Sequence, residues 1–239
     1  MAAKRISATK LEIIQVATRM FIERGYTATS IKAISDEIRI STGNLTFHFP
    51  TKEHMLRVLV EMLCEFQWGM MEQAADEGKS SLLALCLELT AMAAICEEDE
   101  IGRDFYISAY THPMTLDIIR KNDAARARQV FDEYCPAWSD VNYREAETLV
   151  SGIEYGTMMN TSGSAPLNVR IAGGIGAIML IYGVPEEVRK RKITKVLGMD
   201  YRALGKRILA EFKEYVNGFD EVALEKVLVK MKSYEQEEK

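Results

Sequence analysis

A short polar segment, residues 42–48, carries side chains that suit the recognition of DNA. Asn44 can form two hydrogen bonds with the edge of an adenine. Thr42 and Thr46 can reach phosphates or a thymine methyl group, and Gly43 lets a backbone approach a groove closely. Packing against a core does not by itself explain so polar an outer surface. The segment therefore predicts contacts with a major groove.

Residues beside these positions extend the predicted contacts. Phe47 can pack against a thymine methyl group. His48 can contact a phosphate, although a surface imidazole at a helix end is the alternative. Lys52 places an ammonium at the start of a predicted helix, and the Thr29-Ser30 pair begins another. Because helix N-termini offer free amide groups, both starts are expected to bind phosphates.

Three helices are expected to position these residues. Apolar residues recur at three- and four-residue steps over residues 9–24, which predicts the first helix. The pair at 29–30 can cap a second helix of about ten residues, and Ser41 can cap a short third one. Leu45 and Phe49 would then pack inward. Two such helices joined by a short turn have the proportions of a helix-turn-helix, whose second helix lies in the major groove.

The rest of the chain also reads as helical. Alternation of apolar and polar residues, the signal of a strand, is nearly absent. A helix is expected from a cap at Thr51 to about Asp76, followed by five to seven more. The breaks between them are expected at 76–78, 97–100, 112–113, 135–136, 161–166, 183–185, 198 and 217–218. We predict an all-α fold, with a three-helix helix-turn-helix head over 1–52. A larger helical ligand-binding and dimerisation body over 53–239 follows, and the helix after Thr51 connects the two.

The distribution of charge separates the same two parts. The whole chain has a formal net charge of −5. Residues 1–60 hold nine Lys and Arg against five Asp and Glu, a charge of +4, and residues 61–239 hold 21 against 30, a charge of −9. A basic head on an acidic body suggests that the head alone binds a polyanion.

The sequence contains no motif that is typical of a metal-binding protein, a nucleotide-binding protein or a hydrolase. The four cysteines have neither zinc nor thioredoxin-like spacing, and His48 and His54 are six residues apart, so no metal site is expected. The glycine-rich segment 172–176 lacks the spacing of a nucleotide loop, and close helix packing is its better explanation. No catalytic Ser–His–Asp or Cys–His arrangement can be proposed. We therefore expect no cofactor and no enzymatic activity.

A membrane location is also not expected. The longest apolar run, residues 171–184, spans fourteen residues and is interrupted by glycines, whereas a membrane-spanning helix needs about twenty apolar residues. The basic pair Lys4-Arg5 is not followed by the apolar stretch of a signal peptide. A cytoplasmic location is the default expectation.

Four motifs in order over residues 9–63 resemble a known family. They are Phe21–Tyr26, Thr29–Ile31, Gly43–Leu45 and Phe49–Glu53. This stretch resembles the DNA-binding domain of the tetracycline-repressor (TetR) family of bacterial transcriptional regulators. The resemblance implies an all-helical homodimer, a DNA-binding head, and a body that binds a small molecule and thereby changes the spacing of two heads. The family pattern has tyrosine where this chain has Thr46, so a shorter hydroxyl or a water must replace that phosphate contact.

Several predicted body helices mix Met and aromatic residues with isolated polar ones. Such a mixture suits a largely apolar pocket with a few orienting groups, although the same residues can equally be ordinary core. The candidate pocket residues are Trp68, Phe105, Tyr106, Tyr110, His112, Tyr155 and Met159.

A dimer interface is expected on late helices of the body. Ala172, Gly176 and Leu180 recur at four-residue steps and would allow close approach of another helix, and a helix over 201–216 could complete a four-helix contact. Either helix could instead pack within one subunit.

Two hypotheses on function follow. The first is a ligand-responsive regulator, most simply a repressor, that binds a near-palindromic double-stranded operator as a homodimer and is released by a small, mostly apolar effector. The alternative is a helical interaction module whose head is structural and binds no specific operator.

Overall fold

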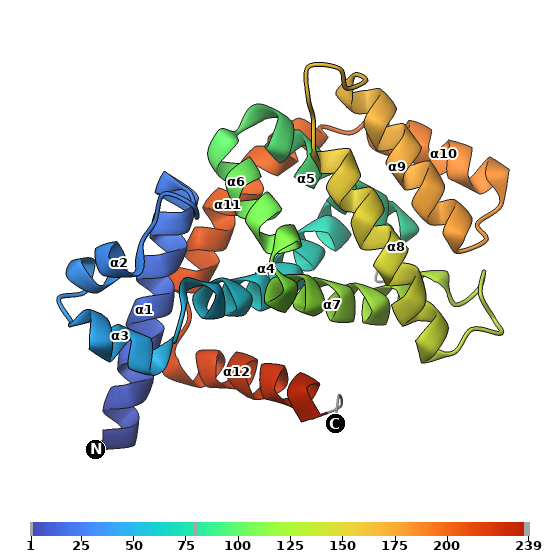
Figure 1. Cartoon of the computed structure of the whole chain (residues 1–239). Helices are drawn as coiled ribbons and strands as arrows, with labels where there is room; N and C mark the ends of the chain where they lie inside the picture. Colours follow the sequence, from blue (N-terminus) through green and yellow to red (C-terminus); the bar gives the residue numbers. More distant parts are fainter. Residues whose placement is uncertain (1, 79–80, 237–239) are drawn as a thin grey trace.

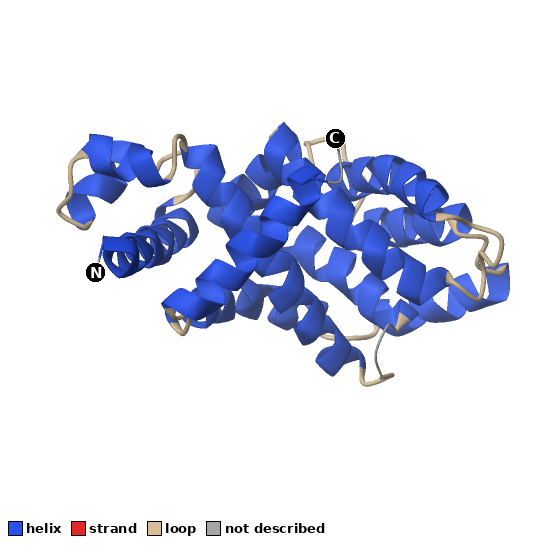
Figure 2. Cartoon of the chain, turned by 90° about the horizontal axis from the view of Figure 1, so that it is seen from below, coloured by secondary structure: helices blue, strands red, loops and turns tan. Residues whose placement is uncertain are grey.

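The computed structural model describes residues 2–78 and 81–236, and side chains within residues 8–234. Within these residues every regular element is a helix, as Figure 2 shows. The helices are α1 (Ala2–Arg24), α2 (Ile31–Glu37), α3 (Thr42–His48), α4 (Lys52–Ala75), α5 (Leu82–Glu98), α6 (Glu100–Thr111), α7 (Pro113–Phe131), α8 (Asp140–Met158), α9 (Leu167–Ile181), α10 (Glu186–Leu197), α11 (Tyr201–Asn217) and α12 (Glu221–Gln236). None of the described helices is long and apolar enough to cross a membrane.

Side-chain caps delimit the two short helices of the head. Ser30 Oγ accepts a hydrogen bond from the backbone N–H of Ala33 at 3.0 Å, and Ser41 Oγ accepts one from that of Asn44 at 3.1 Å. Such caps satisfy amide groups that have no partner within the helix. Between the two helices, Arg39 adopts a left-handed φ of 56°, which turns the chain. This turn ends α2 after seven residues, fewer than the ten expected from periodicity.

The body is built around α5, whose residues are buried on nearly every side. A helix that is hydrophobic all round belongs in a core, and α4, α6, α8, α9, α10 and α11 all pack against it. Figure 1 shows α1–α3 at one end of the molecule, α9 and α10 at the other, and α4 running between them.

Two features of the body differ from the sequence-based expectation. Within the described residues, eight helices follow α4 instead of five to seven, because a helix ends at or shortly before each of the eight expected breaks. The last of them, α12, returns to pack against α1 and α4. In Figure 1 it runs beside α4 and ends near α7.

Candidate functional site

The outer surface of α3 is exposed and polar, as the sequence predicts. Leu45 and Phe49 are buried, with 0% and 5% of their surface exposed. Gly43 and Asn44 are exposed, and Phe47 is 75% exposed. The exposed Phe47 ring is free to pack against an apolar group such as a thymine methyl. The geometry therefore offers a reading surface of the kind that a recognition helix uses.

The polar groups of α3 differ in how free they are. Within the described residues the side-chain amide of Asn44 has no hydrogen-bond partner. The Thr46 hydroxyl donates to the carbonyl oxygen of Thr42 at 3.1 Å, and the Thr42 hydroxyl lies 3.2 Å from that of Ser35. Asn44 is therefore the α3 side chain that is most available to a base edge.

His48 lies at the C-terminal end of α3 beside a cavity of about 200 Å³. Its Nδ1 is buried without a hydrogen-bond partner in the described structure. Burial lowers the pKa of His48, and the nearby ammonium of Lys10 lowers it further. The cavity is also lined by His54, Arg57 and Lys232, so the imidazole faces a basic surface shared by α1, α4 and α12.

The side chains at two predicted phosphate contacts, Thr29 and Lys52, turn inward and form hydrogen bonds within the protein. Thr29 is only 2% exposed, and its hydroxyl donates to the carbonyl oxygen of Gly25 at 2.7 Å. The Lys52 ammonium donates to the carbonyl oxygens of Tyr26 and Thr29 at 2.8 and 3.0 Å and lies 4.0 Å from the centre of the Tyr26 ring. Carbonyl oxygens at the turn after α1 compete for this cation better than solvent does. Ser30 remains exposed at the start of α2.

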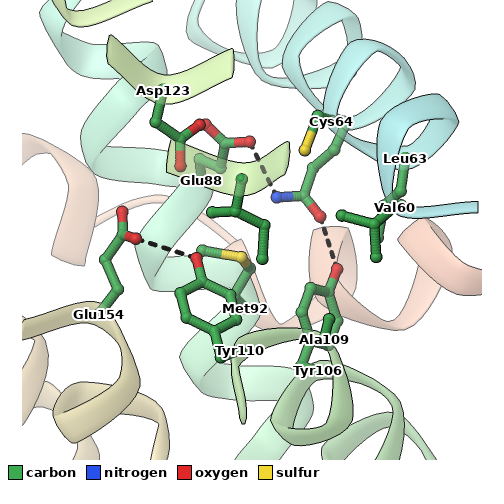
Figure 3. A pocket seen from close by; sticks show the side chains of 12 residues that line it. Val60, Leu63, Cys64, Glu88, Met92, Tyr106, Ala109, Tyr110, Asp123 and Glu154 are labelled. Carbon is green, nitrogen blue, oxygen red and sulfur yellow. Dashed lines mark hydrogen bonds between the residues drawn. The ribbon is translucent and has the colours of Figure 1, made fainter. Parts of the chain in front are cut away.

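The body contains two adjoining cavities, of about 40 and 20 Å³. They share Glu88, Asp123 and Glu154 in their linings. The remaining lining residues of the larger cavity, shown in Figure 3, are Val60, Leu63, Cys64, Gln67, Met92, Tyr106, Ala109, Tyr110 and Ile119. The smaller one adds Leu85, Arg126, Glu147, Val150, Ile178 and Tyr182. Helices α4 to α9 therefore enclose a space at the centre of the body that is lined by both apolar and acidic side chains.

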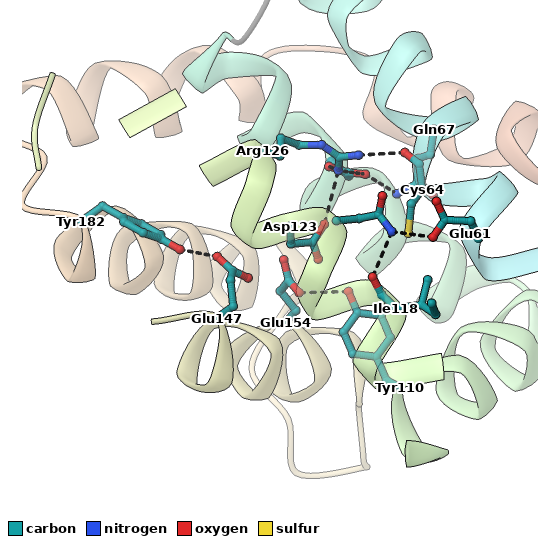
Figure 4. Close-up of polar contacts among 12 residues, drawn as sticks. Glu61, Cys64, Gln67, Tyr110, Ile118, Asp123, Arg126, Glu147, Glu154 and Tyr182 are labelled. Carbon is teal, nitrogen blue, oxygen red and sulfur yellow. Dashed lines mark hydrogen bonds and ion pairs between the residues drawn. The ribbon is translucent and has the colours of Figure 1, made fainter. Parts of the chain in front are cut away.

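A hydrogen-bond network lines this space (Figure 4). Arg126 donates from Nη1 to both carboxylate oxygens of Glu88, at 3.1 and 2.9 Å, and from Nη2 to the carbonyl oxygen of Cys64 at 2.8 Å. The Tyr110 hydroxyl donates to Glu154 at 2.9 Å, and that of Tyr182 donates to Glu147.

Three carboxyl groups of the network have strongly raised pKa values. Burial, opposed in part by Arg126, raises the pKa of Asp123 to about 7. Burial and the charge of Asp123 raise the pKa of Glu147 to about 8. The same two causes raise the pKa of Glu154. Burial therefore favours the protonated forms of these three carboxyl groups.

The predicted pocket residues only partly coincide with this cavity. Tyr106 and Tyr110 line it, and the Trp68 ring lies 4.3 Å from the guanidinium of Arg126. His112 instead caps α7, where its Nδ1 accepts a hydrogen bond from the backbone N–H of Met114 at 3.3 Å.

The other three predicted pocket residues, Phe105, Tyr155 and Met159, do not line the cavity. The sequence predicts a largely apolar pocket with a few orienting groups, but the carboxyl groups that line this cavity are not among the predicted residues. Glu88, alone within the apolar run 82–96, was the available signal.

Helices α8 and α9 each expose large apolar side chains. Leu180 is 61% exposed on α9, and Leu149 is 61% exposed on α8, which packs beside it. A side chain at Gly176 would meet Ile193 of α10 at 3.7 Å, so this glycine partly faces its own subunit. Helix α11, the other predicted interface helix, packs against α1, α4 and α5 of its own subunit, which is the alternative noted for it above.

Ala172 is half-buried on α9.

The fold is that of helical proteins with an N-terminal helix-turn-helix, in which α3 is the exposed second helix of the motif. Residues 13–59 match the family model for bacterial regulatory proteins of the tetR family. Over 71 residues the chain is 34% identical to the HTH-type transcriptional repressor KstR2 of Mycolicibacterium smegmatis. This alignment covers 30% of this chain and 35% of that protein. It is 30% identical over 90 residues to KstR2 of Rhodococcus jostii, covering 37% and 44%. The alignments thus span less than half of these curated relatives.

Solved structures extend the similarity of fold into the body. RolR in complex with resorcinol superposes with a TM-score of 0.65 at 18% identity, covering 81% of this chain and 96% of that one. RolR without ligand gives a TM-score of 0.58 at 17% identity, covering 77% and 95%. Together with the family match, these findings confirm the resemblance seen in the sequence. The family match is confined to the N-terminal domain, where residues 13–59 are similar to the DNA-binding domain of tetR-family regulators.

Proposed function

We propose that this protein is a transcriptional repressor that binds a near-palindromic operator as a homodimer and releases it when a small molecule enters the body cavity. The observation that carries the proposal is the outer surface of α3, where Asn44 is unpaired among the described residues and Phe47 is 75% exposed. The net charge of +4 on residues 1–60 supports the same assignment, since phosphates are bound by positive charge.

A physical connection between the cavity and the head supports ligand response. Helix α6 carries Tyr106 and Tyr110, which line the cavity. The same helix carries Asp104, whose carboxylate accepts hydrogen bonds from the backbone N–H of Thr27, at 2.8 Å, and from its hydroxyl. A shift of α6 on ligand binding would therefore move the turn between α1 and α2. A ligand changes this equilibrium only if it binds the two positions of α6 with different affinity.

The exposed apolar residues of α8 and α9 support dimerisation. Val141, Leu149, Val169 and Leu180 are each more than half exposed. Two such helix pairs can form a four-helix contact between subunits. One α3 reads few base pairs, so two heads related by a two-fold axis are needed to select an operator.

The proposal is tested by selecting DNA from a random duplex library with the purified protein. Recovery of a near-palindromic sequence that binds more tightly than scrambled duplex, with an affinity that falls as salt rises, supports the regulator. Binding that shows no preference among sequences contradicts it and leaves a head with a structural role.

The resorcinol in the RolR structure belongs to that protein. For this chain it indicates only that a small polar aromatic compound is a reasonable first compound to screen for release of the selected operator. Loss of operator binding on addition of a compound that also binds the isolated protein supports the ligand response. Binding without any change in operator affinity contradicts that part of the proposal.

A further inference from the structure

The charges around the body cavity do not balance. Four carboxyl groups line it, from Glu88, Asp123, Glu147 and Glu154. The one cationic side chain in the described lining is Arg126. Buried charges are normally paired, so an excess of buried acids requires protons or a cation to compensate it.

The available guanidinium groups are already engaged. Arg126 forms its shortest contacts with Glu88 and the Cys64 carbonyl oxygen, and its nearest distance to Asp123 is 3.4 Å. Arg120, on the same helix, donates to the Ser151 hydroxyl at 2.9 Å. Asp123 therefore shares Arg126 with Glu88, whereas Glu147 and Glu154 form no ion pair among the described residues.

One carboxylate oxygen in the cavity lining, Oε2 of Glu147, is buried without a hydrogen-bond donor in the described structure. Glu147 is 2% exposed, and its Oε2 has no hydrogen-bond partner in the described structure, although Oε1 accepts from Tyr182. A buried acceptor without a donor is costly, and it calls for a group that is absent from the polypeptide. Figure 4 shows Glu147 and Glu154 pointing from α8 toward Asp123, so the unsatisfied oxygen belongs to a converging acidic cluster.

The opposite side of the larger cavity is apolar. Figure 3 shows Asp123 and Glu154 on one side and Val60 and Leu63 on the other, with Met92 between them. The Tyr110 ring lies on the acidic side, where an aromatic face can attract a cation. A bound molecule therefore meets acids at one end and hydrocarbon at the other.

We propose that the cavity takes a small organic cation, with an ammonium or amidinium group among Asp123, Glu147 and Glu154 and a compact apolar body against Val60 and Met92. This inference rests on the proposed function, in which the effector enters this cavity. Volumes of about 40 and 20 Å³ hold only a few waters, so the ligand displaces them and moves flexible side chains such as Met92.

Binding of such a cation is expected to release protons. Without it, the carboxyl groups of Asp123 and Glu147 lose their protons only as the pH rises through pKa values of about 7 and about 8. A cation favours the ionised carboxylates, so its affinity rises across this pH range. The other titratable or charged groups facing the cluster are Glu154, Glu88, Arg126, Arg120, Cys64, Tyr106, Tyr110 and Tyr182.

The experiment compares three probes of nearly equal shape: benzylamine, benzyl alcohol and benzoate. Isothermal titration calorimetry of the full chain is run in two buffers with different ionisation enthalpies, from about pH 6 to about pH 8.5. We expect benzylamine to bind about tenfold more tightly than benzyl alcohol, with proton release, and benzoate not to bind. Equal or tighter binding of the alcohol or benzoate overturns the inference, as does the absence of any benzylamine binding.

Isosteric variants locate the site. Glu147→Gln and Glu154→Gln are each expected to weaken benzylamine binding about tenfold, since each removes a charge that the cation needs. Glu145→Gln is the matched control, because Glu145 is exposed on the same helix. Circular dichroism and thermal unfolding verify that each variant is folded. Unchanged affinity in both folded cavity variants places the amine elsewhere and overturns the inference.

Operator binding separates this inference from the proposed function. If benzylamine binds through Glu147 and Glu154 but operator affinity is unchanged, the cation site stands and ligand-controlled repression fails. If only the neutral alcohol binds and releases the operator, the regulator stands and the cation site fails.

Discussion

The carboxylate of Asp104, on α6, accepts a hydrogen bond from the backbone N–H of Thr27 at 2.8 Å. Thr27 lies in the turn between α1 and α2, and Gly25 makes the close approach possible. A side chain there would come within 2.9 Å of the Asp104 carboxylate, and its φ of +93° favours glycine. This contact joins a cavity-lining helix directly to the DNA-binding head.

Asp104→Ala is therefore expected to loosen the turn after α1. Loss of the acceptor leaves the Thr27 amide without its partner, which costs about 1–3 kcal/mol locally. Hydrogen exchange should speed up at residues 25–29 and stay unchanged in α8. Glu100→Ala, an exposed substitution at the start of the same helix, is the control. Unaltered exchange at residues 25–29 would show that the contact does not hold the turn.

Lys52→Met is expected to destabilise the head rather than to remove a phosphate contact. The ammonium satisfies the carbonyl oxygens of Tyr26 and Thr29, and their loss of a charged donor should cost about 1.5–3 kcal/mol. The measurement is urea unfolding, together with DNA binding well below the melting temperature. Lys32→Met, at an exposed surface ion pair, should change little. Full stability with weakened DNA binding would instead return Lys52 to the phosphate contacts.

Asn44→Ala is expected to relax sequence preference at one operator position on each half-site. An asparagine that bonds an adenine edge contributes about 1–3 kcal/mol of discrimination against the wrong base. Binding to the selected operator and to single-base variants of it measures the effect. If operator and variants weaken by the same factor, Asn44 positions the head without reading a base.

Leu149→Glu and Leu180→Glu are expected to shift the protein toward the monomer. Each places a charge in a surface that the proposed dimer buries, and an unpaired buried charge is strongly unfavourable. Light scattering across a dilution series gives the mass. Val222→Glu, at a residue 64% exposed on α12, is the control. A dimer that survives both α8 and α9 substitutions would place the interface elsewhere.

Stability is expected to fall as the pH rises from about 5 to about 8. The pKa of Glu147 is raised to about 8 in the folded protein by burial and by Asp123, so the folded state holds a proton that the unfolded state releases. Its contribution is fully present below the unfolded pKa of 4.5 and is lost as the pH rises through about 8. Urea unfolding should show a flatter pH dependence for Glu147→Gln than for the unchanged protein, and an identical slope would contradict the burial of an ionisable carboxyl there.

The sequence by itself determined the helices of the head and the surface that α3 exposes. Ser30 and Ser41 act as caps through the backbone groups of their own helices, and Leu45 points inward because of its register with Phe49. These effects depend on residues three or four apart, so the local pattern is sufficient to predict them. The same logic located the breaks between the later helices.

Only the tertiary structure decided which polar side chains are free to bind a partner and which residues from different helices lie together. The charge of Lys52 and its place at a helix start suit a phosphate contact. Its ammonium instead donates to carbonyl oxygens that lie 23 and 26 residues earlier in the chain. Glu88, Asp123 and Glu154 stand on three different helices and read singly as solvated acids. They line one cavity because α8 packs against both α5 and α7. The periodicity of each helix does not predict which residues of different helices come together.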